Sequence, residues 1–338
     1  MTHRGGRTLP FYLLVLGWSA VAAGIAASPV MHALPPAWLW APLALTTVLF
    51  GLPHGAADHL AVLRALGKPV TFGRIGSVLV LYLTVSALVV AVWQLAPAAC
   101  AIGFIGLTWF HWGQGDLHAL AAYLGAGHLP RRSQRVSAVV VRGSLPMFVP
   151  LLAHPEAYVG VLSSFAALFD ADAARRIGEA ASTLPTGGLA AAWCAIVAAY
   201  VASCSRSSRA ARRDLARDVA EVAALAAFFA VLPPVFAVGV YFGAWHAPRH
   251  VARLADLRAA DRQPVERSAA GDLAAFAWEA APLTAVALVL LVLFGYGVGG
   301  NAITATNAAA VYLVGISALT VPHVAVVTAM DGREKLWR

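Results

Sequence analysis

Four short segments of the chain place histidines among apolar residues, where an imidazole can bind a metal ion. Polar groups are costly inside a membrane and are usually functional there. Imidazole is a suitable ligand for iron, zinc, copper and nickel, so the pattern indicates a metal site. The segments are Gly51-Leu52-Pro53-His54-Gly55-Ala56-Ala57-Asp58-His59, Trp109-Phe110-His111-Trp112-Gly113-Gln114-Gly115-Asp116-Leu117-His118, Trp245-His246-Ala247-Pro248-Arg249-His250 and Val321-Pro322-His323.

The third segment contains two histidines that are one helical turn apart. His246 and His250 are four residues apart, so on a continuous helix both side chains project from the same face. Pro248 lies between them and alters that geometry without separating the two far. A lone intramembrane histidine also serves as a hydrogen bonder between helices. We therefore treat His59, His118 and His323 as additional candidates without an assigned role.

Two carboxylates follow the first two histidines closely. Asp58 comes four residues after His54, and Asp116 comes five residues after His111. A carboxylate near a metal-bound histidine commonly accepts the proton of the other ring nitrogen and so orients the ring. We predict this supporting role for Asp58 and Asp116; capping or interfacial positions are the alternative.

Aromatic residues flank two of the histidine segments and are candidates to line a long, conjugated, apolar substrate. The alternative is that they form interfacial belts or packed helix faces. These residues are Trp109, Phe110, Trp112, Tyr241, Phe242 and Trp245.

The composition predicts that the elements holding these residues are transmembrane helices. Hydrophobic residues make up 60% of the 338 residues and charged residues 12%, against about 25% charged residues in a soluble domain. Several apolar runs approach the roughly 20 residues that cross a bilayer. We predict an all-α, polytopic transmembrane helix bundle with about ten membrane segments, eight to ten being possible. They lie near residues 9–27, 38–62, 75–96, 98–125, 136–153, 187–204, 218–232, 235–251, 273–298 and 302–328.

Basic residues between the apolar runs predict the orientation. The net charge of +8 is concentrated in these short segments, as is typical of cytoplasmic loops, which argues against nucleic acid as a partner. We expect a multi-pass protein of the cell (inner) membrane with both termini in the cytoplasm. The second, fourth, eighth and tenth segments then run in the same direction, so their histidines converge in depth.

Residues 1–338 are predicted to form a single integral membrane domain. Residues 154–186 are too polar to cross the membrane, and we expect an outer loop with a short interfacial helix there. Pro233-Pro234 interrupts the apolar pattern of residues 218–251, because proline removes a backbone donor and clashes with the preceding turn. Two short helices are expected on either side of it. The three cysteines have no metal or redox spacing.

The three longer motifs together, and their order, resemble the Brp/Blh family of membrane-bound β-carotene 15,15'-dioxygenases. The matching motifs are Pro53-His54-Gly55-x-x-Asp58, His111-Trp112-Gly113-x-x-Asp116 and Trp245-His246-x-x-Arg249-His250. The resemblance implies an all-helical enzyme that uses Fe(2+) and O2 to cleave the central double bond of β-carotene into two retinal molecules. It further implies that His54, His111, His246 and His250 hold the iron. A rhodopsin is a candidate acceptor of the retinal.

Two other function classes compete with this interpretation. Another histidine-rich membrane oxygenase, such as a two-iron desaturase or hydroxylase, resembles the chain less. A resemblance to that class would require several HxxxH- or HxxHH-type clusters, and this chain offers one H-x-x-x-H pair, His246 and His250, plus scattered single histidines. A metal or proton transporter would use intramembrane His and Asp as a relay. A relay spreads through the membrane depth, whereas the histidines here are expected at one depth.

Overall fold

The computed structural model describes residues 8–205, 208–260, 269–299 and 305–338, and every regular element within them is a helix. The predicted all-α class is therefore confirmed. Seven helices in this part of the chain are long and apolar enough to cross a membrane, which makes the chain an integral membrane protein. They are Tyr12–Met31, Ala37–Ala56, Phe72–Leu95, Arg132–Ala153, Thr186–Cys204, Leu273–Val298 and Ala308–Glu334.

The predicted count of about ten membrane segments is not confirmed. The three predicted segments outside the set of seven correspond to α6 (Pro97–Ala119), α11 (Arg209–Val231) and the continuous run from α12 (Pro234–Tyr241) into α13 (Ala247–Ala260). These helices carry most of the polar residues discussed below, which lowers their hydropathy. Residues 302–304 of the last predicted segment lie outside the described residues. The basic segment from Arg249 to Arg267, expected as a connecting loop, is helical up to Ala260, and its residues 261–267 lie outside the described residues.

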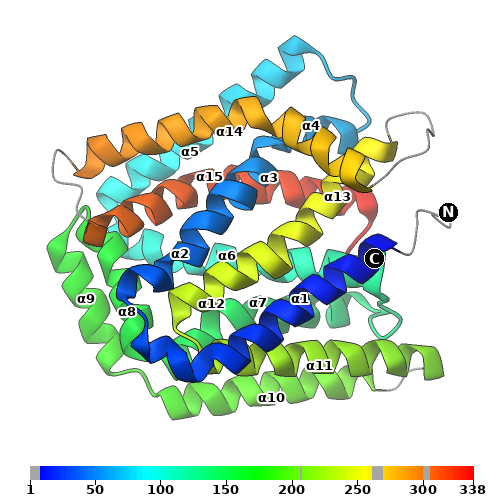
Figure 1. Cartoon of the computed structure of the whole chain (residues 1–338), viewed down its shortest axis with the longest axis horizontal. Coiled ribbons are helices and arrows are strands. Elements are labelled where there is room, and N and C mark those ends of the chain that lie inside the picture. The colour runs from blue at the N-terminus through cyan, green and yellow to red at the C-terminus, as the bar shows by residue number, and fades with distance from the viewer. Residues whose placement is uncertain (1–7, 206–207, 261–268, 300–304) are drawn as a thin grey trace.

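The apolar helices divide into lipid-facing and internal ones. In α5 (Phe72–Leu95) and α14 (Ala269–Gly299), only 6% of the residues in the apolar stretch of the helix are buried inside the protein. In α7 (Arg132–Ala153) and α15 (Ala305–Glu334), the share is 61%. Figure 1 shows α5 and α14 along one edge of the molecule and α10 (Thr186–Cys204) and α11 along the opposite edge, with α15 between them. The start of α1 (Thr8–Ala27) and the C-terminus lie at the same end.

Helices α6 and α7 cross so closely that neither tolerates a side chain at the crossing. A Cβ atom added to Gly113 would lie 2.1 Å from the carbonyl oxygen of Val139, and one added to Gly143 would lie 2.0 Å from that of Trp109. Small residues allow such backbone approach between membrane helices. Gly113 follows His111 by two residues, so this crossing fixes where His111 lies.

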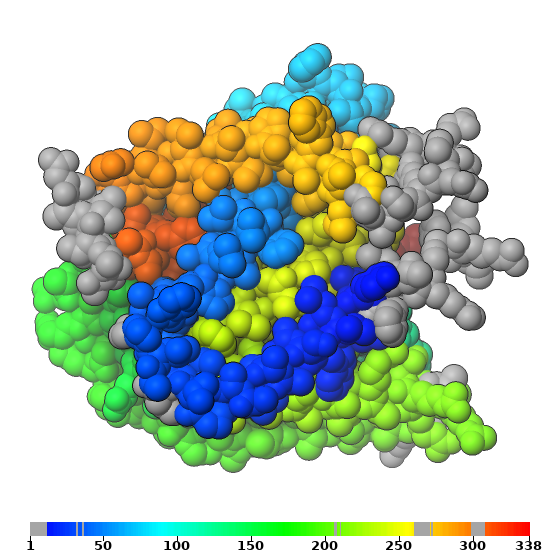
Figure 2. Space-filling view, in the orientation of Figure 1, coloured from blue at the N-terminus to red at the C-terminus, as the bar shows by residue number. Residues whose placement is uncertain are grey.

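Two helices widen into a π-helical turn just before a motif proline. α2 (Pro36–Thr46) passes through the turn Thr47–Gly51 into α3 (Leu52–Ala56), and α12 passes through the turn Phe242–His246 into α13. Pro53 and Pro248 lack the N–H that would continue the ordinary ladder, and π-turns of this kind are frequent at functional sites. α2 packs against α12, and both helices are visible on one face (Figure 2).

The remaining short helices connect these elements. α4 (Asp58–Ala65) follows α3 after a break at Ala57. Residues 154–186, expected as a loop with one short helix, form two helices, α8 (Pro155–Ala167) and α9 (Ala171–Ser182). Asp170 caps α9 by accepting a hydrogen bond from the amide of Asp172 at 2.8 Å. Hydrogen bonds from the Ala173 and Asp172 amides hold the pKa of Asp170 below its usual range. The helix break predicted at Pro233-Pro234 is present between α11 and α12.

Candidate metal centre

Five buried histidine rings from five different elements come together inside the bundle. His54 lies in α3, His111 in α6, His246 at the end of a π-turn, His250 in α13 and His323 in α15. The ring centroid of His323 lies 4.8 Å from the ring centroid of His111, 4.9 Å from that of His54 and 5.3 Å from that of His250. His54 and His250 are 5.1 Å apart, and His111 and His246 are 5.0 Å apart. All five are at most 5% exposed.

Four of these rings carry a buried nitrogen without a hydrogen-bond partner among the described residues. These atoms are Nδ1 of His111 and Nε2 of His246, His250 and His323. In His54, Nδ1 lies 2.9 Å from the carbonyl oxygen of Phe50, so Nε2 is the nitrogen that remains to bind a metal ion. An unpaired buried polar atom costs about 1–3 kcal/mol, and an ion is one established reason for retaining it. The chemistry of these rings therefore fits a metal ion that prefers imidazole. Among the described residues, the ligand atoms that all lie within 4.8 Å of one another belong to Asp58, His250 and His323. The predicted ligands His54, His111, His246 and His250 are gathered in the same region without reaching this spacing as a set.

Asp58 contacts His323 and not the histidine that precedes it by four residues. Its Oδ2 lies 2.8 Å from Nδ1 of His323 and accepts a hydrogen bond from the Tyr82 hydroxyl at 3.3 Å. The sequence spacing suggested His54 as its partner. That spacing does not apply, because the break at Ala57 places His54 and Asp58 in different helices.

Asp116 is buried and joins α6 to the third motif. It accepts hydrogen bonds from Arg249 at 2.9 Å, from Arg142 at 2.9 Å and from the Trp245 indole at 3.2 Å. The structure records no hydrogen bond between Asp116 and His111 among the described residues. Arg249 also lies over the Trp245 ring, with its guanidinium carbon 4.0 Å from the ring centroid. Asp116 thus contacts the two residues that flank His246 and His250 rather than a histidine.

The Asp116 carboxylate belongs to a buried ion network that sequence analysis missed. Each of the three nitrogens of Arg142 has its own carboxylate, since Nε contacts Asp116, Nη1 contacts Asp218 and Nη2 contacts Glu221 at 2.6 Å. Asp218 in turn contacts His128 at 3.0 Å and the hydroxyl of Tyr200. The signal that would have revealed the network is charge in an apolar run, because such residues normally pair inside the bundle.

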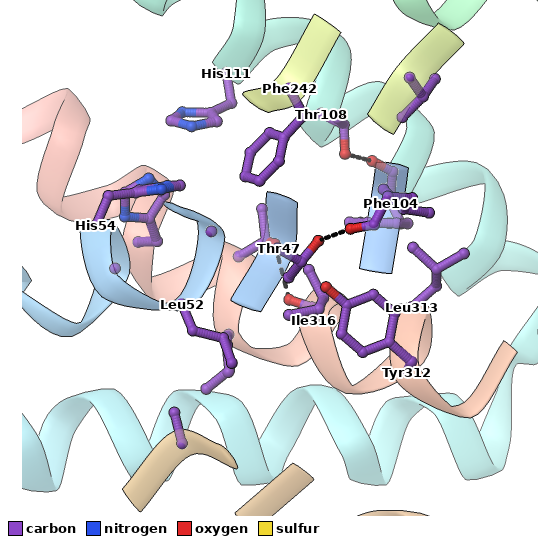
Figure 3. Close-up of a pocket in the computed structure, with 18 of the residues that line it drawn as sticks. Thr47, Leu52, His54, Phe104, Thr108, His111, Phe242, Tyr312, Leu313 and Ile316 are labelled. Atoms are coloured by element: carbon purple, nitrogen blue, oxygen red, sulfur yellow. Dashed lines mark hydrogen bonds between the residues drawn. The ribbon is translucent and has the colours of Figure 1, made fainter. Parts of the chain in front are cut away.

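An apolar cavity of about 360 Å³ opens beside the histidines. His54, His111 and His323 line it, together with residues of α2, α5, α6, α8, α12, α14 and α15. In Figure 3, His54 and His111 lie at one end of the pocket, and Tyr312 and Leu313 lie toward the other. The cluster is therefore placed where it can act on a molecule held in the apolar space.

Of the predicted aromatic residues, Trp112 and Phe242 line this cavity. The other four pack away from its lining. The Trp109 indole donates to the carbonyl of Val140 at 2.8 Å, and Phe110 stacks on Trp337 with centroids 6.4 Å apart. Tyr241 and Trp245 are buried in the core.

The other two candidate histidines differ from the five in the cluster. His59 lines the cavity, and its Nδ1 lies 2.9 Å from the carbonyl oxygen of Ala56. His118 pairs with Glu334 at 3.1 Å, and no ring contact with the five histidines is recorded for it in the described part of the chain. His118 is therefore outside the cluster.

The fold and the site together define an all-helical integral membrane protein with a buried, multi-histidine centre beside an apolar cavity. The family model described as Beta-carotene 15,15'-dioxygenase matches residues 45–331. The chain is therefore a member of the β-carotene 15,15'-dioxygenase family, as the motifs predicted.

Two relatives from Halobacterium salinarum illustrate the similarity. The chain is 44% identical to the protein described as "Probable beta-carotene 15,15'-dioxygenase Blh", over 98% of this chain and 95% of that protein. It is 30% identical to "Probable beta-carotene 15,15'-dioxygenase Brp", over 87% of this chain and 84% of that protein. No solved structure matches the chain significantly.

Proposed function

We propose that the chain cleaves the central 15,15' double bond of β-carotene with O2, giving two molecules of retinal, at a non-haem Fe(2+) held by His54, His111, His246 and His250. That the chain is a carotenoid-cleaving dioxygenase follows from its family. The single observation that carries the finer proposal is the cluster of buried imidazoles with unpartnered nitrogens at the edge of an apolar cavity.

The proposed reaction with O2 requires a redox-active metal, and an imidazole donor set is compatible with one. Neutral imidazoles leave the full charge on a divalent ion, and zinc cannot exchange electrons with O2. When bound, ferrous iron would supply the electrons and the open coordination position that reaction with O2 requires. A resemblance to a two-iron desaturase or hydroxylase would require several closely spaced histidine clusters, whereas this chain has one H-x-x-x-H pair, His246 and His250, which favours one metal ion.

The protein's own contribution is to hold the substrate and exclude water. Trp112 and Phe242 border the cavity beside His54 and His111. Apolar residues of α5 and α14, whose other faces are exposed to lipid, complete the lining. A carotenoid dissolved in the bilayer would thus reach the histidines between helices without crossing water.

The remaining predictions belong to the same proposal. The protein would reside in the cell (inner) membrane, in line with its seven apolar helices. Both termini would lie in the cytoplasm, in line with its basic connecting segments and with the position of the start of α1 and the C-terminus at one end of the molecule (Figure 1). Two termini on one side require an even number of crossings, so at least one of the less apolar helices α6, α11 and α12–α13 would cross as well. Retinal would leave into the lipid, where a rhodopsin is a candidate acceptor.

Expression in a bacterium that makes β-carotene tests the proposal. We expect the orange colour to fade and retinal to accumulate in the extract, as measured by chromatography. The matched control is the His111→Ala variant expressed at the same level. Persistence of β-carotene with the wild-type chain properly inserted would contradict the proposal.

A further inference from the structure

We infer that His323 is a fifth ligand of the metal through Nε2, and that Asp58 and Tyr82 orient it. The inference rests on the proposed metal centre and extends its ligand set. His323 is the ring with three close neighbours in the cluster, at centroid distances of 4.8 Å, 4.9 Å and 5.3 Å from His111, His54 and His250. It is 5% exposed, and its Nε2 has no partner among the described residues.

The hydrogen bond to Asp58 determines which nitrogen of His323 is available to bind the metal ion. Asp58 is 1% exposed, and its Oδ2 lies 2.8 Å from Nδ1 of His323. When Asp58 is ionised, its carboxylate only accepts hydrogen bonds, so Nδ1 of His323 then carries the proton and Nε2 carries the lone pair. Metal-bound histidines normally show this arrangement, with the second nitrogen donating to a carboxylate or a backbone carbonyl.

His54 has the same arrangement with a different acceptor. Its Nδ1 lies 2.9 Å from the carbonyl oxygen of Phe50, which likewise directs Nε2 away from the backbone. His54 and His323, whose ring centroids are 4.9 Å apart, are therefore both held by a hydrogen bond at Nδ1, which leaves Nε2 for a metal ion. The bond from Nδ1 to Asp58 already bridges two helices; what distinguishes His323 is that its other nitrogen, Nε2, is buried with no partner among the described residues.

Tyr82 secures the carboxylate from a third helix. Its hydroxyl lies 3.3 Å from Oδ2 of Asp58 and 3.0 Å from the carbonyl oxygen of Leu319, one turn before His323. The contact joins α4, α5 and α15 at the position where His323 enters the cluster. Tyr82 and Asp58 are thus positioning residues, which act on the metal through the ring of His323.

A competing arrangement uses Asp58 itself as a ligand. Asp58, His250 and His323 each offer an atom, and these atoms lie within 4.8 Å of one another. Oδ1 of Asp58 has no partner among the described residues. Two histidines and one carboxylate form a known iron site. The bond between Oδ2 and Nδ1 favours the positioning role, and the test below separates the two.

The experiment measures metal binding in the purified full-length protein, independently of activity. Iron affinity is determined by competition with a chelator for the wild type, His323→Gly, Asp58→Asn and the matched control His118→Gly, whose histidine is buried but pairs with Glu334. The same proteins are loaded with Co(II), whose visible absorption is weaker at five-coordinate than at four-coordinate sites. Imidazole is added to His323→Gly to replace the missing ring.

We expect His323→Gly to bind iron at least about 10–100-fold more weakly, to gain the stronger four-coordinate Co(II) spectrum, and to recover with imidazole. Asp58→Asn should lose about 10–100-fold in affinity and keep the wild-type Co(II) spectrum. His118→Gly should match the wild type.

Wild-type affinity and spectrum in His323→Gly would overturn the inference and leave the four-histidine centre intact. A changed Co(II) spectrum in Asp58→Asn would overturn the positioning role and make Asp58 a ligand. A wild-type protein that cleaves β-carotene without binding iron would instead refute the proposed function.

Discussion

The histidine cluster and the Arg142 network are both polar, buried and adjacent, yet their central groups are paired differently. Among the described residues the network has unpartnered atoms too, namely Nδ1 of His128, and Oε1 of Glu221 and Nη2 of Arg249, which lie 3.7 Å apart. In the network, each nitrogen of Arg142 meets its own carboxylate, from Asp116, Asp218 or Glu221. In the cluster, four rings carry a nitrogen with no partner in the described part of the chain. The two regions share α6, on which His111 and Asp116 lie five residues apart.

The difference separates structural polarity from functional polarity. A buried charge is retained at low cost when its partners are complete, and its removal strands those partners. A buried imidazole nitrogen without a partner lowers stability by about 1–3 kcal/mol, and a bound ion is one way to offset that cost. We therefore expect variants in the cluster to lose the metal and variants in the network to lose the fold.

The largest effect is expected in the cluster. His54→Ala, His111→Ala, His246→Ala and His250→Ala should each lose bound iron and retinal production. Their unfolding temperature in detergent should stay closer to that of the metal-free wild type than the unfolding temperature of Arg142→Leu does, because no buried charge loses its partner; His54→Ala loses one hydrogen bond, to the carbonyl oxygen of Phe50. Iron assay, retinal chromatography and thermal unfolding measure the three quantities. Full activity in any one variant would remove that residue from the ligand set.

The second effect is expected in the network. Arg142→Leu leaves three carboxylates without their guanidinium and should cost about 3–5 kcal/mol of stability. The yield of monodisperse protein and its unfolding temperature measure this loss. Arg175→Leu is the matched control, because Arg175 pairs with Asp172 and Glu179 but is 61% exposed, where such pairs contribute about 0–1 kcal/mol. Equal stability of the two variants would contradict a structural role for the network.

The third effect lies between the two regions. Asp116→Asn weakens the contacts to Arg249 and Trp245, which flank His246 and His250. We expect iron affinity to fall by about 10–100-fold, with a smaller loss of stability than in Arg142→Leu. Chelator competition and thermal unfolding on the same sample measure both. If neither quantity changes, Asp116 does not connect the network to the cluster.

The smallest effect concerns the cavity wall. Trp112 lines the cavity and Trp109 does not. Trp112→Leu should lower kcat/KM for β-carotene about fivefold, the equivalent of about 1 kcal/mol of apolar contact, with iron content unchanged. Trp109→Leu should leave kcat/KM near the wild-type value. A larger loss in Trp109→Leu would mean that the substrate occupies a different space.

Much of the fold could be predicted because apolar runs and prolines act locally. The break at Pro233-Pro234 and the helical nature of the chain follow from such local rules. The partner of Asp58 could not be predicted from spacing, because Ala57 ends one helix and His323 lies on α15. Similarly, Arg142 attracts attention only as a charge in an apolar run, and its partners on α6 and α11 depend on how helices pack.

The predicted site residues illustrate the same limit. Four histidines, drawn from motifs nearly 200 residues apart in the chain, lie together with His323 in the structure. Whether they hold iron stays a prediction. Spacing alone did not distinguish Trp112 from Trp109, because the direction of a side chain on α6 depends on where α7 crosses it.

Metal analysis combined with single-turnover cleavage tests the central claim most directly. The purified wild-type protein is stripped with a chelator and reloaded with Fe(II) or with Zn(II), and retinal is measured after addition of β-carotene and O2. The account predicts about one iron per chain, retinal formation in proportion to bound Fe(II), and none with Zn(II), which cannot exchange electrons with O2. Undiminished cleavage by the stripped protein, or two irons per chain, would contradict it.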